Sequence, residues 1–205
     1  MAQNSIGTDD SDRELVKRIL SGSNSAFGEL IRNNQRLVFS ITLRMLNNPS
    51  DNDDICQDIF IKAYTNISRF KFGSRLSTWI ARIAYTTCVN HLQKKKINLL
   101  DDIIASDDDE QEVESFSNRI KDDSIEMPDE SLVIKELKSR LDEEINLLPP
   151  LLKTIISLYH QEELSYVEIA EVMGLPVGTV KSYLFRGRKL LREKLTEEFK
   201  QERLL

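Results

Sequence analysis

A strongly acidic segment divides this chain into two parts, each with apolar residues at helical spacing. Between Asp101 and Glu130 there are thirteen acidic residues and two basic ones, a net charge of −11 in thirty residues. The few apolar residues of this segment follow no period, and a segment so rich in like charge cannot offset the entropy cost of ordering. We therefore expect a flexible acidic linker at residues 98–130 between two small packed units.

On both sides of the linker, apolar residues recur at i, i+3 and i+4, the period of an amphipathic helix. Before it, this pattern predicts helices around Leu15–Leu20, Phe27–Met45, Ile55–Ile67 and Trp79–His91. After it, the pattern continues through Leu132–Leu148 and restarts at Pro149-Pro150. No segment alternates with period two for long enough to be a strand, so the predicted fold class is all-α. The expected division is a disordered N-terminal tail at 1–10, a helical domain at 11–97, the linker, and a second helical domain at 131–200.

Charge is segregated along the chain. The whole sequence carries −6, so the residues outside the acidic segment carry +5. Acid-free windows at 59–100 and 172–192 hold eight and five basic residues, a distribution typical of proteins that bind nucleic acid. There is no apolar run of about 18 residues to span a bilayer and no secretory signal. Together with only two cysteines, Cys56 and Cys88, this indicates a cytoplasmic protein with reduced thiols.

Residues 165–195 have the pattern of a helix-turn-helix. Ser165 and Glu168 have the spacing of a capping box, Gly174 suits a left-handed helix end, and a second helix is predicted to begin near Pro176. The second helix has an apolar stripe and, on its other face, a basic surface without acids. Because such a helix enters the major groove with its N-terminal residues, this pattern predicts binding of duplex DNA. A helical hairpin with a solvated basic face is the alternative.

Two further groups of residues stand out in the first domain. Asp54, Gln57 and Asp58 share one helix face, which is suited to docking a basic or amphipathic partner helix. For the nearby acids Asp51 and Asp53, stabilisation of the helix dipole is a sufficient explanation. In the segment 67–96, lysine and arginine residues alternate with aromatic residues. This composition suits single-stranded DNA, because nucleobases stack on aromatic rings and basic side chains attract the phosphates. Trp79 also fits the core stripe of its helix. No paired carboxylates, nucleophile motif or metal spacing is present, so no enzyme activity, metal or cofactor is expected.

Taken in order, these motifs resemble the bacterial sigma-70 family, and the short two-domain form resembles its extracytoplasmic-function group. The segments that carry the resemblance are Asp54–Phe60, Arg69-Phe70, Ser77–Ala84, Leu148-Pro149, Glu168–Ala170, Gly178–Ser182 and Arg186–Arg188. The resemblance implies that the face of Asp54, Gln57 and Asp58 binds the clamp helices of core RNA polymerase. It implies recognition of a melted −10 element by Arg69, Phe70, Lys71, Phe72, Ser74, Arg75, Trp79, Arg82, Thr86 and Asn90. It implies recognition of a duplex −35 element by Thr179, Lys181, Ser182, Tyr183, Phe185, Arg186, Arg188 and Lys189.

Two residues depart from the family pattern. Thr86 stands where the family often has asparagine, and Tyr183 stands where arginine is common; both affect which promoter sequence is recognised. The implied partners are core RNA polymerase, through its clamp helices and flap, promoter DNA, and an anti-sigma factor, with no small-molecule substrate. A helix-turn-helix regulator that binds a palindrome unaided, with the first domain used for dimerisation or sensing, is the main alternative. An RNA-binding or anti-termination protein is a third possibility.

Overall fold

The computed structural model describes residues 10–46, 49–105 and 132–202, and within these ranges every regular element is a helix. This confirms the predicted all-α fold. In chain order the elements are α1 (Asp10–Leu20), α2 (Asn24–Met45), α3 (Pro49–Asn66), the short 3₁₀ helix η1 (Ile67–Arg69), α4 (Leu76–Ala105), α5 (Leu132–Asn146), α6 (Pro150–His160), α7 (Tyr166–Met173) and α8 (Val177–Glu202).

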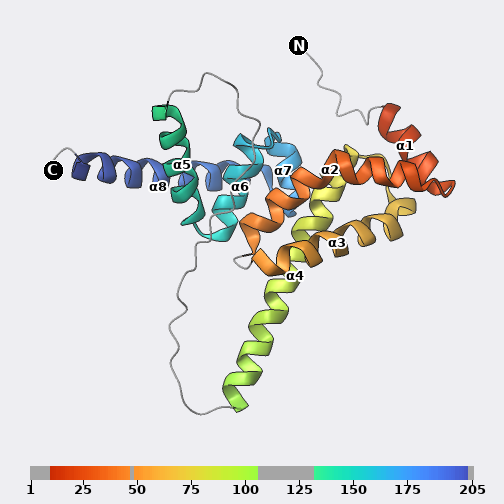
Figure 1. Cartoon of the computed structure of the whole chain (residues 1–205), viewed down its shortest axis with the longest axis horizontal. Helices are drawn as coiled ribbons and strands as arrows, with labels where there is room; N and C mark the ends of the chain where they lie inside the picture. Colours follow the sequence, from red (N-terminus) through yellow and green to blue (C-terminus); the bar gives the residue numbers. More distant parts are fainter. Residues whose placement is uncertain (1–9, 47–48, 106–131, 203–205) are drawn as a thin grey trace.

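The first unit is a bundle of α1 to α4, in which α2 contacts each of the other three helices (Figure 1). Its core is formed by the apolar stripes that the sequence pattern predicts, with Leu30, Ile41, Ile59 and Ile80 all buried. Glycine and serine set the bend between α1 and α2. Gly22 has a φ of +87°, which few other residues tolerate, and the Ser23 hydroxyl accepts from Ala26 N at 3.3 Å to cap α2.

The second unit is formed by α5 to α8. Its capping box is present as predicted: Glu168 N donates to the Ser165 hydroxyl at 3.3 Å, and Ser165 N donates to Glu168 Oε2 at 2.9 Å. Gly174 ends α7 in the left-handed conformation with φ +65°. A proline lies in the first turn of α6, where its missing N–H costs no hydrogen bond. These local signals therefore fix the helix-turn-helix of α7 and α8.

In that unit the apolar stripe of α8 packs on the other helices, with Val180, Leu184 and Leu191 buried. Gly187 continues the same stripe and is also buried. A Cβ atom at Gly187 would lie 3.1 Å from both Cγ1 and Cδ1 of Ile156. Glycine at this position therefore allows α8 to approach α6 closely, a feature that the predicted stripe did not include.

The predicted ends of the first unit differ in detail from the observed helices. α4 continues to Ala105, although the linker was expected to begin at residue 98. No glycine or proline interrupts the sequence between Ile97 and Ala105, so nothing local stops the helix there. At the other end, α1 begins at Asp10. The remainder of the expected tail and linker, 1–9 and 106–130, lies outside the described residues.

The two units pack against each other: α2 contacts α6, and α4 contacts α7 (Figure 1). Three residues one turn apart on α2 reach the second unit: Arg36, Ser40 and Arg44. Arg36 Nη2 donates to the Gln161 carbonyl at 3.3 Å, and the Ser40 and Ser157 hydroxyls hydrogen-bond at 3.3 Å. Arg44 hydrogen-bonds to Asn146 and lies 3.6 Å from Asp142 Oδ1. The contact between the units thus includes a polar stripe along α2.

Candidate nucleic-acid and protein interfaces

The loop between η1 and α4 carries an aromatic cluster. Phe70 is buried, at 6% exposure, and its ring centroid lies 4.8 Å from that of Phe72 and 5.4 Å from that of Trp79. Trp79 is half-buried, which agrees with its place on the core stripe. The loop folds back and puts the Phe70 ring in the core, so Phe70 is not an exposed stacking group in this structure, and its assignment to the −10 element stays a prediction. Phe72 remains partly exposed.

Most other residues assigned to the −10 element lie on the surface. Arg69, Lys71, Arg75, Arg82, Thr86 and Asn90 are exposed. The last four follow one another at helical spacing from the N-terminal end of α4, so they share a face with Trp79. Ser74 is an exception, at 4% exposure. The Thr86 hydroxyl donates to the Arg82 carbonyl at 2.8 Å, as threonines on a helix surface commonly do.

A groove lies between α2 and α3, beside the polar face predicted on α3. Asp54, Gln57 and Asp58 are all exposed, so the structure places them together as expected. The groove has a volume of about 760 Å³. Its apolar lining residues are Phe27, Ile31, Phe39, Cys56, Phe60 and Ile61, and Gln57 lies at its polar side. Burial raises the pKa of the Cys56 thiol, so it lines the groove as a neutral group.

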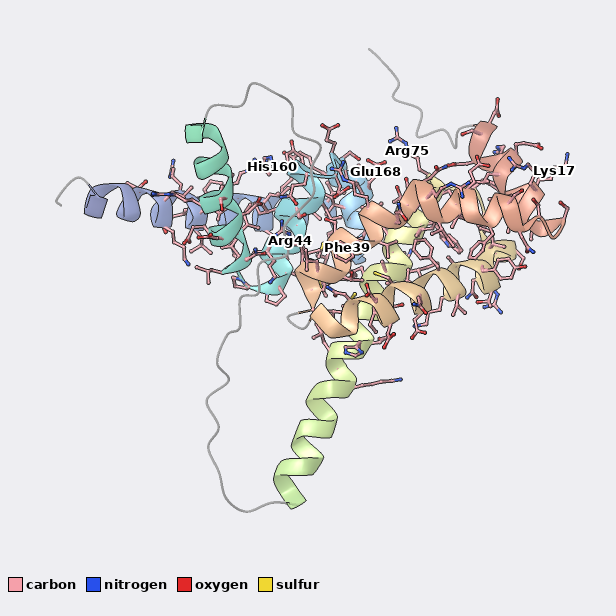
Figure 2. The ribbon with its side chains drawn as sticks, in the orientation of Figure 1. Lys17, Phe39, Arg44, Arg75, His160 and Glu168 are labelled. Carbon is pink, nitrogen blue, oxygen red and sulfur yellow. The ribbon has the colours of Figure 1, made fainter. Side chains whose placement is uncertain are left out.

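Sequence reasoning found the acidic rim of this surface and missed its apolar floor. Ile61 and Phe39 are 59% and 38% exposed, although both are large apolar residues. Figure 2 shows Phe39 on α2, in the half of the helix that also carries Arg44. Both residues fall off the buried stripes of their helices. The signal available in the sequence was the position of these two apolar residues outside the apolar stripe of their helices. A large apolar side chain outside the stripe does not reach the core and is therefore a candidate for contact with a partner.

The outer face of α8 carries the residues assigned to the −35 element. Lys181, Ser182, Phe185, Arg186, Arg188 and Lys189 are exposed, and Thr179 and Tyr183 are half-buried. Phe185 is notable because a large aromatic side chain is 69% exposed there. The Arg186 guanidinium lies 6.0 Å from the centre of the Tyr183 ring. The structure therefore brings together the basic face that the sequence predicts.

Arg188 is held by a cluster that the sequence analysis missed. Its guanidinium lies 4.9 Å from the centre of the Tyr159 ring, and its Nε donates to His160 Nε2 at 3.2 Å. The Tyr159 ring stacks on Tyr166 with centroids 5.0 Å apart, and Lys181 lies 5.7 Å from the centre of the Tyr166 ring. Burial, with a smaller contribution from the nearby Arg188 charge, lowers the pKa of His160. Tyr159, just before the capping box, and Tyr166, within it, were the available signal.

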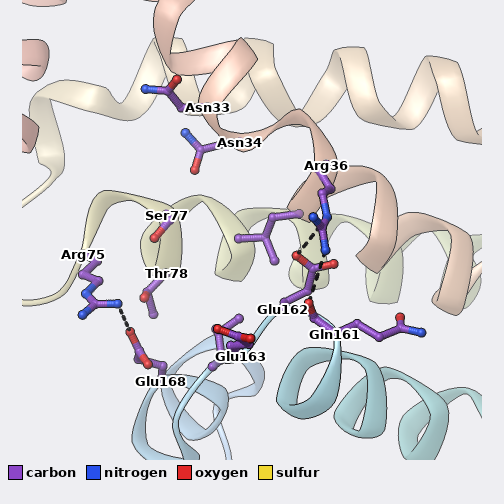
Figure 3. A pocket seen from close by; sticks show the side chains of 12 residues that line it. Asn33, Asn34, Arg36, Arg75, Ser77, Thr78, Gln161, Glu162, Glu163 and Glu168 are labelled. Carbon is purple, nitrogen blue, oxygen red and sulfur yellow. Dashed lines mark hydrogen bonds and ion pairs between the residues drawn. The ribbon is translucent and has the colours of Figure 1, made fainter. Parts of the chain in front are cut away.

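A polar cavity of about 480 Å³ lies between the two units. Figure 3 shows Arg36 of α2 facing Glu162, and Arg75 facing Glu168 across the cavity. Arg75 Nη1 lies 3.5 Å from Glu168 Oε1, and Arg36 Nε lies 3.9 Å from Glu162 Oε2. Arg75, a residue assigned to the −10 element, is therefore engaged by the helix-turn-helix unit in this arrangement.

Two other findings concern chemistry and membranes. Within residues 10–46, 49–105 and 132–202, no three His, Cys, Asp or Glu side chains lie close enough together to hold a metal ion. Cys56 and Cys88 are free thiols, and burial raises the pKa of Cys88 to about 12. Over the same part of the chain, no helix has the length and apolar character needed to cross a membrane.

Comparison with known families matches the two units separately. The family described as Sigma-70 region 2 matches residues 30–97, and the family described as Sigma-70, region 4, matches residues 138–191. Two solved structures share the fold at 21% sequence identity. CnrH, in complex with the cytosolic domain of CnrY, has a TM-score of 0.61 and covers 92% of this chain and 99% of that one. The sigma factor RpoE of Bartonella quintana, in complex with the anti-sigma factor NepR, has a TM-score of 0.57 and covers 83% and 96%.

Two relatives that match over most of their length are described as ECF RNA polymerase sigma factors. The chain is 33% identical over 186 residues to the ECF RNA polymerase sigma factor SigW of Bacillus subtilis, covering 90% of this chain and 97% of that protein. It is 35% identical over 187 residues to the ECF RNA polymerase sigma-E factor of Haemophilus influenzae, covering 90% and 95%. The two matched regions and these relatives confirm the resemblance that the sequence motifs carry: the chain belongs to the ECF RNA polymerase sigma factors of the sigma-70 family.

Proposed function

We propose that this protein is a transcription initiation factor that binds core RNA polymerase and directs it to specific promoters. One observation carries the proposal: a single chain presents two chemically different surfaces for DNA. The basic face belongs to α8, the second helix of the helix-turn-helix, and suits the major groove of a DNA duplex. The loop after η1 and the exposed face of α4 combine basic side chains with aromatic side chains. This combination suits the separated strands of melted DNA.

We assign polymerase binding to the surface between α2 and α3. The exposed carboxylates of Asp54 and Asp58 attract a basic partner, and the apolar groove beside them, with Ile61 at 59% exposure, offers contact area to an amphipathic helix. In this proposal the clamp helices of the polymerase bind there, and the flap binds the second unit. No step of the proposal requires catalysis by this chain, and its place of action is the cytoplasm.

Reading both promoter elements at once requires the two units to separate. Elements about 25 base pairs apart lie about 85 Å from each other at about 3.4 Å per step. In the packed arrangement α4 contacts α7 and Arg75 pairs with Glu168. We infer that polymerase and promoter binding replace these contacts. The segment 106–131 connects the units, and 26 residues, if fully extended, reach roughly 85–95 Å at about 3.3–3.6 Å each.

An anti-sigma factor is the proposed negative regulator. The similar chain RpoE was solved in complex with the anti-sigma factor NepR, and CnrH with the cytosolic domain of CnrY. A partner of this kind would cover the groove between α2 and α3 or the basic face of α8. Competition between such a partner and core polymerase for this chain is the expected mode of control.

The test is in vitro transcription with core RNA polymerase and fragmented genomic DNA from the source organism, followed by mapping of RNA 5′ ends. We expect discrete start sites that depend on added protein and share sequence elements about 10 and 35 base pairs upstream. A footprint of the protein alone on a palindromic duplex, without new start sites, would instead establish the helix-turn-helix regulator.

The polymerase surface has a matched pair of variants. Ile61→Asn changes an exposed side chain of the groove, and Leu20→Asn changes a side chain of similar exposure, 56%, on α1. We expect Ile61→Asn, and charge reversal of Asp54 and Asp58 to lysine, to weaken binding to core polymerase, and Leu20→Asn to leave it unchanged. Equal affinity for all variants would remove this surface from the proposal.

A further inference from the structure

The N-terminal end of α4 is capped by a residue from another helix. Arg75 immediately precedes Leu76, the first residue of α4, and its carbonyl accepts from Trp79 N at 3.1 Å. The Arg75 side chain cannot serve as the cap, because a guanidinium has donors and no acceptor. The Asp12 carboxylate of α1 takes this role: Leu76 N donates to Asp12 Oδ2 at 2.9 Å. A carboxylate at a helix N-terminus also complements the helix dipole.

The next residue of α1 holds the loop that precedes α4. The Arg13 guanidinium lies 4.9 Å from the centre of the Phe72 ring. Phe72 has a φ of +57°, a left-handed conformation that is strained for a bulky side chain. Such a conformation persists only where the surroundings stabilise it, and here the Phe70 ring, 4.8 Å away, and Arg13 both contact the Phe72 ring.

α1 is itself fixed to the bundle. Leu15, Val16 and Ile19 are 7%, 2% and 3% exposed, and α1 contacts α2 and η1. Asp12 and Arg13 lie in the first turn of this helix. Their contacts with the loop are therefore made from a packed support, and they join residues that are about sixty positions apart in the chain.

We propose that Asp12 and Arg13 are positioning residues for recognition of the melted −10 element. The inference rests on the proposed function and adds to it a role for α1. Asp12 fixes the start of α4, and Arg13 fixes the strained conformation at Phe72. Together they hold the loop 70–75 in one shape before DNA arrives, so binding a separated strand does not have to order it. Neither residue is required to touch the DNA.

Two matched pairs of variants test the proposal. Asp12→Ala removes the cap, and Glu14→Ala removes the same charge from an exposed position on the same helix. Arg13→Gln removes the cation from the Phe72 ring, and Lys17→Gln is its counterpart at an exposed position, labelled on α1 in Figure 2. Asp12→Asn keeps an oxygen acceptor and serves as the conservative variant. Circular dichroism and thermal unfolding establish that each variant is folded.

The readout is the affinity of reconstituted holoenzyme for a fork template whose −10 element is single-stranded. We expect Asp12→Ala to weaken this affinity about 2- to 30-fold, the range that loss of a helix cap corresponds to at tenfold per about 1.4 kcal/mol. Arg13→Gln should have a similar effect, Asp12→Asn a smaller one, and the two controls none. Affinity for core polymerase and for a −35 duplex should not change. Faster amide exchange at Leu76 in Asp12→Ala reports the lost cap directly.

The outcomes separate the inference from the function on which it rests. If wild-type protein directs initiation while Asp12→Ala and Arg13→Gln bind the fork template normally, the positioning role is overturned and the proposed function stands. Equal losses in fork, −35 and polymerase binding would show general destabilisation and also overturn the role. If wild-type protein directs no initiation, the proposed function fails, and the inference fails with it.

Discussion

Arg75 and Glu168 form an ion pair that joins the two units, with Arg75 Nη1 3.5 Å from Glu168 Oε1. The same carboxylate completes the capping box of α7, because its Oε2 accepts from Ser165 N at 2.9 Å and from the Ser165 hydroxyl at 2.7 Å. Figure 2 shows the two residues next to each other at the contact between the units. One side chain therefore stabilises the helix-turn-helix and contacts a residue assigned to the −10 element.

These two roles of Glu168 can be separated. Glu168→Ala removes both the cap and the ion pair, and we expect it to lower the free energy of unfolding by about 0.5–2 kcal/mol, as loss of a cap does. Arg75→Ala removes only the ion pair, and its side chain is 65% exposed, so the expected change is about 0–1 kcal/mol. Urea denaturation followed by circular dichroism measures both. A larger loss for Arg75→Ala would contradict the assignment of the stabilising role to the cap.

Gly187 should not tolerate a side chain. A Cβ at this position would lie 3.1 Å from two atoms of Ile156, which is 2% exposed and would have to shift by a few tenths of an ångström within the core. We expect Gly187→Ala to lower the free energy of unfolding by about 1–2 kcal/mol, since overpacking outweighs the better helix propensity of alanine. Gly178→Ala is the control on the same helix, because nothing lies within 4 Å of its added Cβ.

A second substitution tests the cause of that loss. Ile156→Val removes Cδ1, one of the two atoms that the new Cβ meets, so it should destabilise the Gly187→Ala protein less than it destabilises wild type. The coupling energy of this double-mutant cycle is the measurement. Strictly additive effects would show that the contact with Cδ1 is not the reason.

Stability should fall in mild acid through His160. Burial and the neighbouring Arg188 lower its pKa below the ordinary value, so the folded state prefers neutral imidazole and the unfolded state binds more protons. The stabilising contribution is therefore complete above the unfolded pKa of about 6.5 and is lost as the pH falls through that range. We expect the stability difference between pH 7.5 and 5.5 to be smaller in His160→Gln than in wild type.

Nuclear magnetic resonance titration gives an independent check on the same residue. Protonation removes the acceptor for Arg188 Nε, which donates to His160 Nε2 at 3.2 Å. Arg188→Ala should therefore raise the pKa of His160 toward its ordinary value without restoring it fully, since burial remains. An unchanged titration curve would assign the whole shift to burial.

Two residues of α8 should respond differently to promoter sequence. Arg186 is exposed beside Tyr183, at a position suited to a bidentate contact with guanine, and Arg186→Ala should cost about 1–3 kcal/mol on the preferred −35 element. Lys189 lies further along the helix and 3.8 Å from Glu193, so Lys189→Ala should weaken all duplexes alike. Equal losses on every sequence for Arg186→Ala would make it a phosphate contact.

Local signals in the sequence determined most of the fold. Gly174 and the capping box at Ser165 were sufficient to place α7, and the apolar period was sufficient to predict the helices on both sides of the linker. The end of α4 was missed because the linker was drawn just before the acidic residues that begin at Asp101, whereas no glycine or proline stops the helix there. The apolar period also predicted that most site residues lie on exposed faces, because these residues fall on the side of each helix opposite its apolar stripe.

Long-range contacts were the part that no local pattern contains. Leu76 and Asp12 are 64 positions apart, and nothing at either position indicates that one caps the other. Phe70 was assigned to the −10 element, yet its ring is buried and lies 5.4 Å from that of Trp79. The pairing of Arg75 with Glu168 likewise depends on how the two units pack. The helices of each unit are predictable from the sequence, but the contact between the units is not.

The polar stripe of Arg36, Ser40 and Arg44 has a consequence for the energetics of the whole molecule. Arg36 is exposed, and an ion pair of this kind exchanges for water at little net cost and is screened by mobile ions. Arg44 is buried, so its contacts with Asn146 and Asp142 are screened much less. Added salt should therefore loosen the contact between the units at Arg36 before it does so at Arg44.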